Sequence, residues 1–406
     1  MEKRSYTIVT ASYWGFTLTD GALRMLVLLH FHSLGYSSVQ LAFLFLLYEA
    51  CGIVTNLFGG WIGSRVGLKV TLFSGLATQV VALLALSLVQ QGWMELLSVV
   101  YVMGAQALSG VAKDLTKMSS KSAVKLLVPA LANKEVENRA LFKWVAVLTG
   151  SKNALKGVGF LLGGVLLGWF GFQWALWLMA GALTVILLVG MFTMRQDLGR
   201  SKAKVKFTQL FSKSREINYL SFARFFLFGS RDIWFVVGLP VFLKETLNWS
   251  FAAVGAFMAA WVIGYGLIQA GAPAFLRNGG AGAALRWAGI LTAVTGSLAL
   301  VVELEFQLGL AVLVGLAVFG MVFAVNSAVH SYLILAYTSS DEVALNVGFY
   351  YMANAGGRLI GTLLSGVVYF IHGLPGCLWV STGFVAVATA LTAFLPRQPQ
   401  ASATGT

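Results

Sequence analysis

The sequence has few charged residues: only 11% of its 406 residues are Asp, Glu, Lys or Arg, whereas 58% are hydrophobic. Apolar runs recur along nearly the whole chain with short polar breaks, and no soluble core could bury them all. The chain is therefore predicted to be a polytopic membrane protein. A helix needs about 20 apolar residues to cross a bilayer. On that measure we expect twelve spans, near residues 7–31, 39–62, 70–90, 96–115, 141–168, 174–194, 217–243, 251–275, 285–303, 308–335, 344–371 and 377–395.

Cysteines and catalytic motifs are also scarce. The two cysteines, Cys51 and Cys377, lie in separate halves, and we interpret both as small apolar fillers. There is no HExxH motif and no glycine-rich phosphate loop ending in GK, and the four histidines do not cluster by sequence spacing. We therefore expect neither an enzyme nor a cofactor or metal site. A sensor or scaffold would need a soluble module, and no polar segment exceeds a few dozen residues.

Basic residues outnumber acidic ones by 28 to 15, and their positions indicate the membrane topology. Basic residues collect on the cytoplasmic side of a membrane protein. In a twelve-span chain only Lys244 lies on the other side, so both termini are predicted to be cytoplasmic in a multi-pass protein of the inner (plasma) membrane. Nucleic-acid binding is the rival explanation of the charge, but no basic patch interleaved with aromatics supports it. The residues on the cytoplasmic side are Lys3, Arg4, Arg65, Lys69, Lys134, Arg139, Arg195, Arg200, Lys202, Lys204, Lys206, Lys213, Arg215, Arg277, Arg286 and Arg397.

A polar segment divides the chain into two similar halves. We predict an N-terminal six-helix bundle at 1–194, a cytoplasmic linker at 195–216, and a C-terminal six-helix bundle with a tail at 217–406. The halves echo each other, because FTLTD and LGYSSVQLAF in the first resemble FGSRD and LNWSFAAVGAF in the second, with Asp20 and Asp232 212 residues apart. This pattern is typical of transporters built from internal repeats. Chance similarity between hydrophobic helices is the alternative.

The junction GGWIGSRVGLK, residues 59–69, resembles the loop motif of the major facilitator superfamily. In that motif, glycines let helices approach closely and basic residues lock the cytoplasmic face. Ser64 stands where the family usually has an aspartate, and Leu68 where it often has a basic residue. The resemblance implies an all-α membrane fold of twelve helices in two six-helix bundles.

Several charges fall inside the expected spans, where an ionised side chain costs about 2.5–3.5 kcal/mol and needs a partner or a wet cavity. Arg24 lies one turn after Asp20 in the first span, and Asp232 directly follows Arg231 in the seventh. These two spans occupy equivalent places in the repeats, so each half offers a basic residue with a nearby carboxylate. Asp20, Asp232 and Glu49 are candidate proton-coupling residues, or they pair with arginines.

The eleventh span adds a polar stripe. Tyr351, Asn354 and Arg358 fall at i, i+3 and i+7 and share a helical face. Asn326 and His330 lie one turn apart in the tenth span. We include all five among the candidate substrate-binding residues.

Two lysines precede a glycine stripe in the fifth span. Lys152, Lys156, Gly159 and Gly163 fall on one helical face, and glycines there would let a neighbouring helix approach closely. We predict that both lysines face the bundle interior; snorkelling to the cytoplasmic surface is the alternative. A second lysine series is interpreted as a solvated helix end, although it could line a cavity entrance: Lys113, Lys117, Lys121 and Lys125.

Together, Arg24, Lys152, Lys156, Arg231 and Arg358 predict a cavity with a positive field. Arginine forks match carboxylate and phosphate-like oxygens, and lysines add mobile charge. A surplus of basic groups favours a multiply charged anion over a cation or a lipophilic drug. An inside-negative potential would drive such an anion outward.

Several long runs stand out along the chain: ASYWGFTLTDGALRMLVLLHF, ALSGVAKDLTKMSSKSAVKLLVP, LTGSKNALKGVGF, FSKSREINYLSFARFFLFGSRDIWFVVGLPVFL, VFAVNSAVHSYLILAY and NVGFYYMANAGGRLIGTLLSG. These runs resemble the ArsJ-type organoarsenical efflux permeases, and the resemblance extends over nearly the whole chain. The resemblance implies export of 1-arseno-3-phosphoglycerate, an ester that a glyceraldehyde-3-phosphate dehydrogenase makes from arsenate and glyceraldehyde 3-phosphate, and which releases arsenate outside.

The resemblance to these permeases also implies that the protein confers arsenate resistance and that the dehydrogenase is its functional partner. It implies that the protein lies in a lipid bilayer and binds no nucleic acid. A pentavalent ester recognised through its oxygens needs no thiol, which fits the two separate cysteines. The alternative is an exporter or antiporter of another phosphorylated or carboxylated organic anion.

Overall fold

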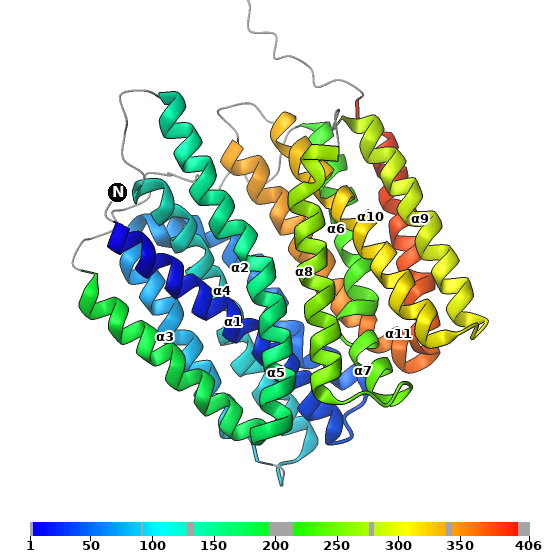
Figure 1. Ribbon diagram of the computed structural model, residues 1–406, viewed down its shortest axis with the longest axis horizontal. Coiled ribbons are helices and arrows are strands. Elements are labelled where there is room, and N and C mark those ends of the chain that lie inside the picture. Colours follow the sequence, from blue (N-terminus) through cyan, green and yellow to red (C-terminus); the bar gives the residue numbers. More distant parts are fainter. Residues whose placement is uncertain are drawn as a thin grey trace, which may run out of the picture. The chain divides into compact units, whose positions relative to one another are not determined.

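The computed structural model describes residues 3–90, 92–127, 134–194, 214–275, 280–337 and 343–396, and every long element in these ranges is a helix (Figure 1). The first half contains α1 (Lys3–Ser33), α2 (Ser38–Val66), α3 (Leu68–Ser87), α4 (Glu95–Leu127) and α5 (Lys134–Thr193). The second half contains α6 (Arg215–Phe235), α7 (Gly238–Glu245), α8 (Phe251–Phe275), α9 (Ala281–Glu303), α10 (Leu308–Ala336) and α11 (Val343–Ala393).

The described residues include nine helical segments that are long and apolar enough to cross a membrane. Two of them, Lys152–Thr193 and Phe349–Ala393, are 42 and 45 residues long. Each is interrupted by a glycine with positive φ, Gly171 at 75° and Gly373 at 62°. Because about 20 residues suffice for one crossing, each of these segments supplies two spans. With the 31-residue α1, the helices account for the twelve predicted spans, and the predicted fold class is confirmed.

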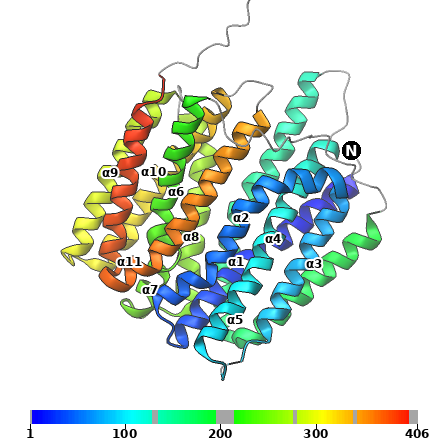
Figure 2. The ribbon, with the colours of Figure 1, turned by 180° about the vertical axis from the view of Figure 1, so that it is seen from behind.

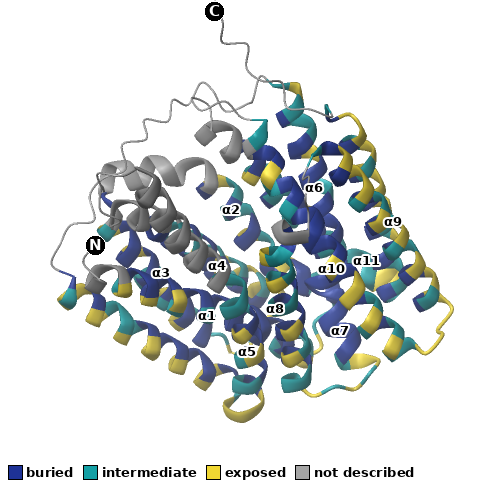
Figure 3. Cartoon of the chain, turned by 45° about the horizontal axis from the view of Figure 1, so that its top comes forward, coloured by how far each residue is buried: buried dark blue, intermediate teal, exposed yellow. Residues whose placement is uncertain are grey.

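Large apolar side chains are exposed on these helices. Trp169 and Phe192 of α5 are 78% and 82% exposed, and exposed residues recur along α9 in Figure 3. A soluble monomer rarely exposes contiguous apolar surface of this kind. We interpret these faces as contacts for lipid acyl chains.

The seventh predicted span, 217–243, lies within the candidate membrane segment Arg215–Glu245, which contains a break because α6 ends at Phe235 and α7 begins at Gly238. Pro240 explains the break, since a proline has no N–H and its ring clashes with the carbonyl four residues earlier. The backbone N–H groups of Val237 and Gly238 both donate to Ser365 Oγ at 3.1 Å. One hydroxyl on α11 therefore satisfies the donors that the break releases.

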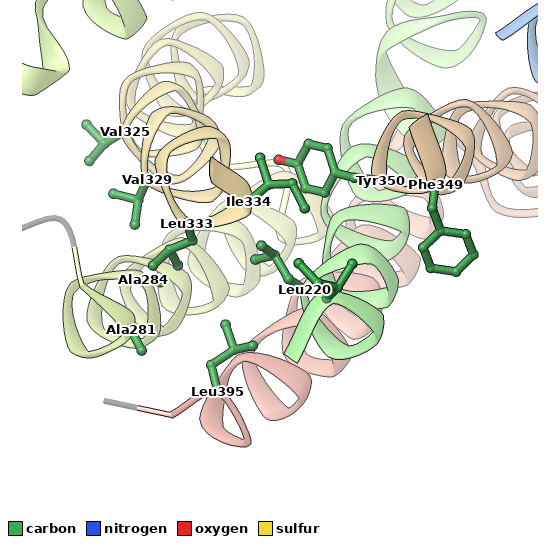
Figure 4. Packing of buried hydrophobic residues seen from close by; sticks show 11 residues of the cluster. Leu220, Ala281, Ala284, Val325, Val329, Leu333, Ile334, Phe349, Tyr350 and Leu395 are labelled. Atoms are coloured by element: carbon green, nitrogen blue, oxygen red, sulfur yellow. The ribbon is translucent and has the colours of Figure 1, made fainter. Parts of the chain in front are cut away.

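The chain forms two compact units. Unit 1 comprises Met1–Leu34, Phe43–Val205 and Ser250–Val262, and unit 2 comprises Gly35–Ala42, Lys206–Trp249 and Ile263–Thr406. In unit 1, α1 packs along α5 and α3 along α4; in unit 2, α6 packs along α11 and α9 along α10 (Figures 1 and 2). Each unit has its own apolar core. That of unit 2 joins α6, α9, α10 and α11 around residues such as Leu220, Val329 and Tyr350 (Figure 4).

Two regions singled out in the sequence are only partly described. Residues 195–213, most of the predicted linker, lie outside the described residues, as do the side chains of residues 56–66 in the loop motif. Gly67, between α2 and α3, has a φ of 96°. This left-handed conformation favours glycine and allows the sharp turn between the two helices.

One close helix contact in unit 1 resembles one in unit 2. A Cβ on Gly159 of α5 would lie 2.5 Å from the carbonyl oxygen of Leu18 in α1. A Cβ on Gly361 of α11, 202 residues later, would lie 2.7 Å from the carbonyl oxygen of Gly229 in α6 and 2.9 Å from Asp232 Cβ. Asp232 lies against Gly361 in unit 2 as Gly21 lies against Gly159 in unit 1, so Asp232 and Gly21 occupy corresponding positions in this contact. This is one residue from the pairing of Asp20 with Asp232 in the sequence repeat.

Candidate functional site

In unit 1, α1 and α2 bring charged residues together in the apolar interior. Arg24 on α1 forms an ion pair with Glu49 on α2, and their side chains are only 7% and 2% exposed. One turn before Arg24, Asp20 accepts a hydrogen bond of 2.5 Å from Tyr48, the neighbour of Glu49. Three of the predicted residues therefore meet here, and each carboxylate has a partner on the facing helix.

The helix α4 adds a lysine and a second carboxylate to the unit 1 cluster. Lys113 Nζ lies 4.0 Å from the centroid of the Tyr48 ring. Asp114 is buried, accepts a hydrogen bond from Thr55 of α2, and lies 3.7 Å from Lys117 Nζ. Lys113 therefore contacts the buried cluster, a position that its interpretation as a solvated helix end did not predict. Lysines that recur every four residues share one helical face, so the sequence does not indicate which of them contacts the buried cluster.

Lys152 and Lys156 stand where the glycine stripe predicts a close helix contact. A Cβ on Gly159 or Gly163 would overlap α1 backbone atoms, and a Cβ on Gly21 would lie 2.7 Å from the carbonyl oxygen of Lys156. The close approach of α1 and α5 is thus confirmed. Both lysines are half-buried, and Lys156 Nζ lies 5.7 Å from the Phe160 ring centroid.

In unit 2, one carboxylate holds two arginines. Asp232 Oδ1 accepts from Arg231 Nε at 2.6 Å, with Arg231 Nη2 at 2.5 Å, and Asp232 Oδ2 accepts from Arg358 Nε at 3.2 Å. The Asp232 side chain is 1% exposed, and those of Arg231 and Arg358 are 15% and 19% exposed. Three predicted residues from α6 and α11 therefore form one cluster, in which two positive charges meet a single negative charge.

A third arginine of unit 2 is more deeply buried. Arg224 of α6 is 5% exposed, and its Nη1 donates to the backbone oxygen and to Oγ of Ser327, both at 3.2 Å. Tyr265 and Gln269 of α8 also donate to Ser327 Oγ, at 3.2 Å and 3.0 Å. Arg224 and Arg231 are seven residues apart in the sequence and therefore share a helical face. Nothing in the sequence indicated Ser327 or the two residues of α8.

The polar residues predicted on α10 and α11 differ in their surroundings. Asn326 Nδ2 donates to the carbonyl oxygens of Trp287 at 2.9 Å and Val322 at 3.1 Å, so this amide group binds backbone. His330 is 1% exposed and its Nδ1 has no hydrogen-bond partner among the described residues; the same holds for Oδ1 of Asn354. Tyr351 is 41% exposed.

The two units thus differ in charge balance. In the unit 1 cluster each arginine or lysine described above has a carboxylate or an aromatic ring beside it, and the carboxylates of Asp20, Glu49 and Asp114 are all buried. In unit 2, Asp232 is the only buried carboxylate among the described residues, against three arginines. The surplus of positive charge therefore concentrates around α6, α10 and α11.

Comparisons with known proteins agree with this architecture. The family described as Major Facilitator Superfamily matches residues 7–230, whereas no curated protein matches the chain. The crystal structure of a mutant of the nucleoside transporter NupG has a TM-score of 0.74 at 15% identity, covering 97% of this chain and 100% of that chain. A D-xylose-proton symporter has a TM-score of 0.70 at 12% identity, covering 97% of each chain.

A bacterial homologue of the iron transporter ferroportin in its inward-facing state has a TM-score of 0.70 at 16% identity, covering 97% of this chain and 98% of that chain. At such identities, these likenesses establish the fold alone.

Proposed function

Because the chain belongs to the Major Facilitator Superfamily and is a multi-pass membrane transporter, we propose that it exports the pentavalent organoarsenical 1-arseno-3-phosphoglycerate and so confers arsenate resistance. The proposal joins two supports. One is the resemblance of its long sequence runs to the ArsJ-type permeases. The other is the chemistry of the arginines of unit 2, of which Arg224 is buried and Arg231 and Arg358 are partly buried.

The single observation that carries the anionic substrate is the charge balance of unit 2. Among the described residues, Arg231 and Arg358 share one buried carboxylate, Asp232, and Arg224 donates to the oxygens of Ser327 instead. Removing arginine from water costs several kcal/mol unless an opposite charge compensates it. An anion with several oxygens would supply that charge, because guanidinium groups bind phosphate-like oxygens in two-pronged fashion.

Asp232 gives the site a means of release. Its two oxygens accept hydrogen bonds from Arg231 and Arg358. A bound oxyanion would compete with the Asp232 carboxylate for the same N–H groups. Substrate binding would therefore displace Asp232 from the two arginines, and Asp232 would pair with them again when the substrate leaves. Arg24, Lys152 and Lys156 of unit 1 remain predicted contributors, with Asp20 and Glu49 as predicted proton-coupling or charge-pairing residues.

The direction of transport follows from charge. Moving one charge across a membrane is worth about 2.3 kcal/mol per 100 mV, so an inside-negative potential would expel a dianion with roughly twice that. We propose an inner-membrane location with cytoplasmic termini, and a glyceraldehyde-3-phosphate dehydrogenase that supplies the ester inside the cell. Export or antiport of another phosphorylated or carboxylated organic anion is the second candidate, favoured by the same arginines.

The test is uptake into everted membrane vesicles that contain the full chain. The ester is generated in place from arsenate, glyceraldehyde 3-phosphate and NAD by the dehydrogenase, and arsenic accumulation is measured with and without a pH gradient. We expect accumulation that requires the dehydrogenase. Equal accumulation of arsenic without the enzyme, or arsenate resistance of cells that lack it, would show that the ester is not the substrate.

A further inference from the structure

Arg224 is an unusual arginine because it is buried and pairs with no acidic side chain in the described part of the chain. Its hydrogen-bond acceptors there are the two oxygens of Ser327, and its Nε has no hydrogen-bond partner among the described residues. The rings of Phe228 and Tyr350 also lie near its guanidinium carbon, at 3.9 Å and 5.0 Å, but a buried charge compensated by neutral oxygens and aromatic rings without a carboxylate is costly. A structural role in joining α6 to α10 would be filled more cheaply by a neutral side chain.

The surroundings of Arg224 are rich in donors. Arg224, Tyr265 and Gln269 all donate to Ser327 Oγ, at 3.0–3.2 Å. A hydroxyl oxygen has only two lone pairs. Three donors that converge on such an oxygen form a cluster with more N–H and O–H groups than acceptors, which suits a ligand that brings only acceptor oxygens.

This cluster lies next to the arginine pair held by Asp232. The guanidinium carbons of Arg224 and Arg231 lie 3.9 Å and 5.1 Å from the centroid of one ring, that of Phe228. Phe323 packs against Phe228 at 5.2 Å and against Tyr265 at 5.7 Å. Two guanidinium groups thus share one aromatic wall, and their positions on α6 are seven residues, or about 10 Å, apart along the helix axis.

We infer that Arg224, with Ser327 and Gln269, forms a second oxyanion subsite in unit 2, beside the subsite of Arg231 and Arg358. The pair of subsites selects anions that carry two phosphate-like tetrahedral groups on a short carbon chain. This inference rests on the proposed function, since it names the feature by which the transporter would distinguish a doubly charged ester from a simple phosphate.

The test uses the purified full chain in detergent and two stable probes of one carbon length, propane-1,3-diyl bisphosphate and propyl phosphate, titrated by calorimetry. We expect the wild type to prefer the bisphosphate by about tenfold or more, as a second charge-assisted contact predicts. Arg224→Gln is expected to remove most of that preference and to leave the affinity for propyl phosphate nearly unchanged. Arg224→Lys, which keeps charge but loses the fork, should be intermediate.

Arg215→Gln is the matched control, because Arg215 is an exposed arginine on the same helix that donates to Tyr219. It should keep the full preference. Ser327→Ala removes the hydroxyl that orients Arg224 and serves as the second variant if Arg224→Gln does not fold; it should also reduce the preference.

The outcomes separate the two proposals. A wild type that binds both probes equally, or an Arg224→Gln or Ser327→Ala protein that keeps the preference, overturns the second subsite and leaves export of an organic anion intact. A wild type that binds neither probe overturns both.

Discussion

Asp232→Asn removes the one buried carboxylate described in unit 2 while keeping the size of the side chain. In the wild type this carboxylate holds Arg231 and Arg358, whose side chains are 15% and 19% exposed. Two opposite charges about 4 Å apart interact by about 4 kcal/mol at an effective dielectric constant of 20. A ligand oxyanion must replace this interaction in the wild type but not in the variant.

Part of the attraction between Asp232 and the arginines offsets the cost of removing these charges from water, so we expect the variant to gain less binding free energy than the full pair energy. If the gain is about a third of the pair energy, the affinity of Asp232→Asn for a phosphate-like anion rises about tenfold. Transport in proteoliposomes should fall at the same time, because nothing recaptures the arginines when the substrate leaves. The assay is calorimetric titration of inorganic phosphate and arsenate, paired with vesicle transport.

The matched control is Glu216→Gln, which neutralises a carboxylate at the start of the same helix whose partner is Ser214. It should change neither measurement. Unchanged or weaker anion binding by Asp232→Asn would refute the idea that Asp232 competes with substrate for these arginines.

Four further variants test this cluster and other parts of the structure. Arg24→Lys and Arg231→Lys should each lower transport at least several-fold while membrane insertion, followed by fractionation, stays normal, because lysine cannot form the two-pronged contact; wild-type transport would remove that arginine from the site. Lys156→Cys should react with a polar thiol reagent and be shielded by substrate, and absence of labelling would favour a packed or snorkelling lysine. Gly163→Ala should destabilise the protein by about 1–3 kcal/mol, seen as a lower melting temperature, because the added methyl overlaps the α1 backbone. Gly168→Ala on the same helix has open space and should be neutral, so equal effects of the two would contradict the packing argument.

The sequence predicted the features that depend on local pattern. Apolar run lengths gave the twelve spans, and the spacing of Gly159 and Gly163 gave the close contact with α1. The break before α7 was not predicted, although Pro240 carries the physical reason for it.

Long-range pairings could not be predicted. Arg358 and Asp232 are 126 residues apart, and Glu49 and Arg24 are 25 apart, so only the fold brings them into contact. The sequence flagged all four because charge in an apolar span needs an explanation. The sequence could not show that Asp232 binds two arginines whereas Asp20 binds a tyrosine. Helix periodicity indicates which face of a helix a residue lies on, but not which residue of another helix it contacts.

The contact between Ser365 and the gap before α7 has an evolutionary consequence. A single hydroxyl on α11 accepts from two backbone N–H groups, and Val237, Gly238 and Ser365 are all buried. Substitution by alanine would orphan both donors at once, so selection should resist change at this serine as firmly as at any ligand-binding arginine. Among related transporters, an invariant serine at this position would indicate a broken helix rather than a particular substrate. Homologues whose seventh helix is straight should lack both the proline and the serine.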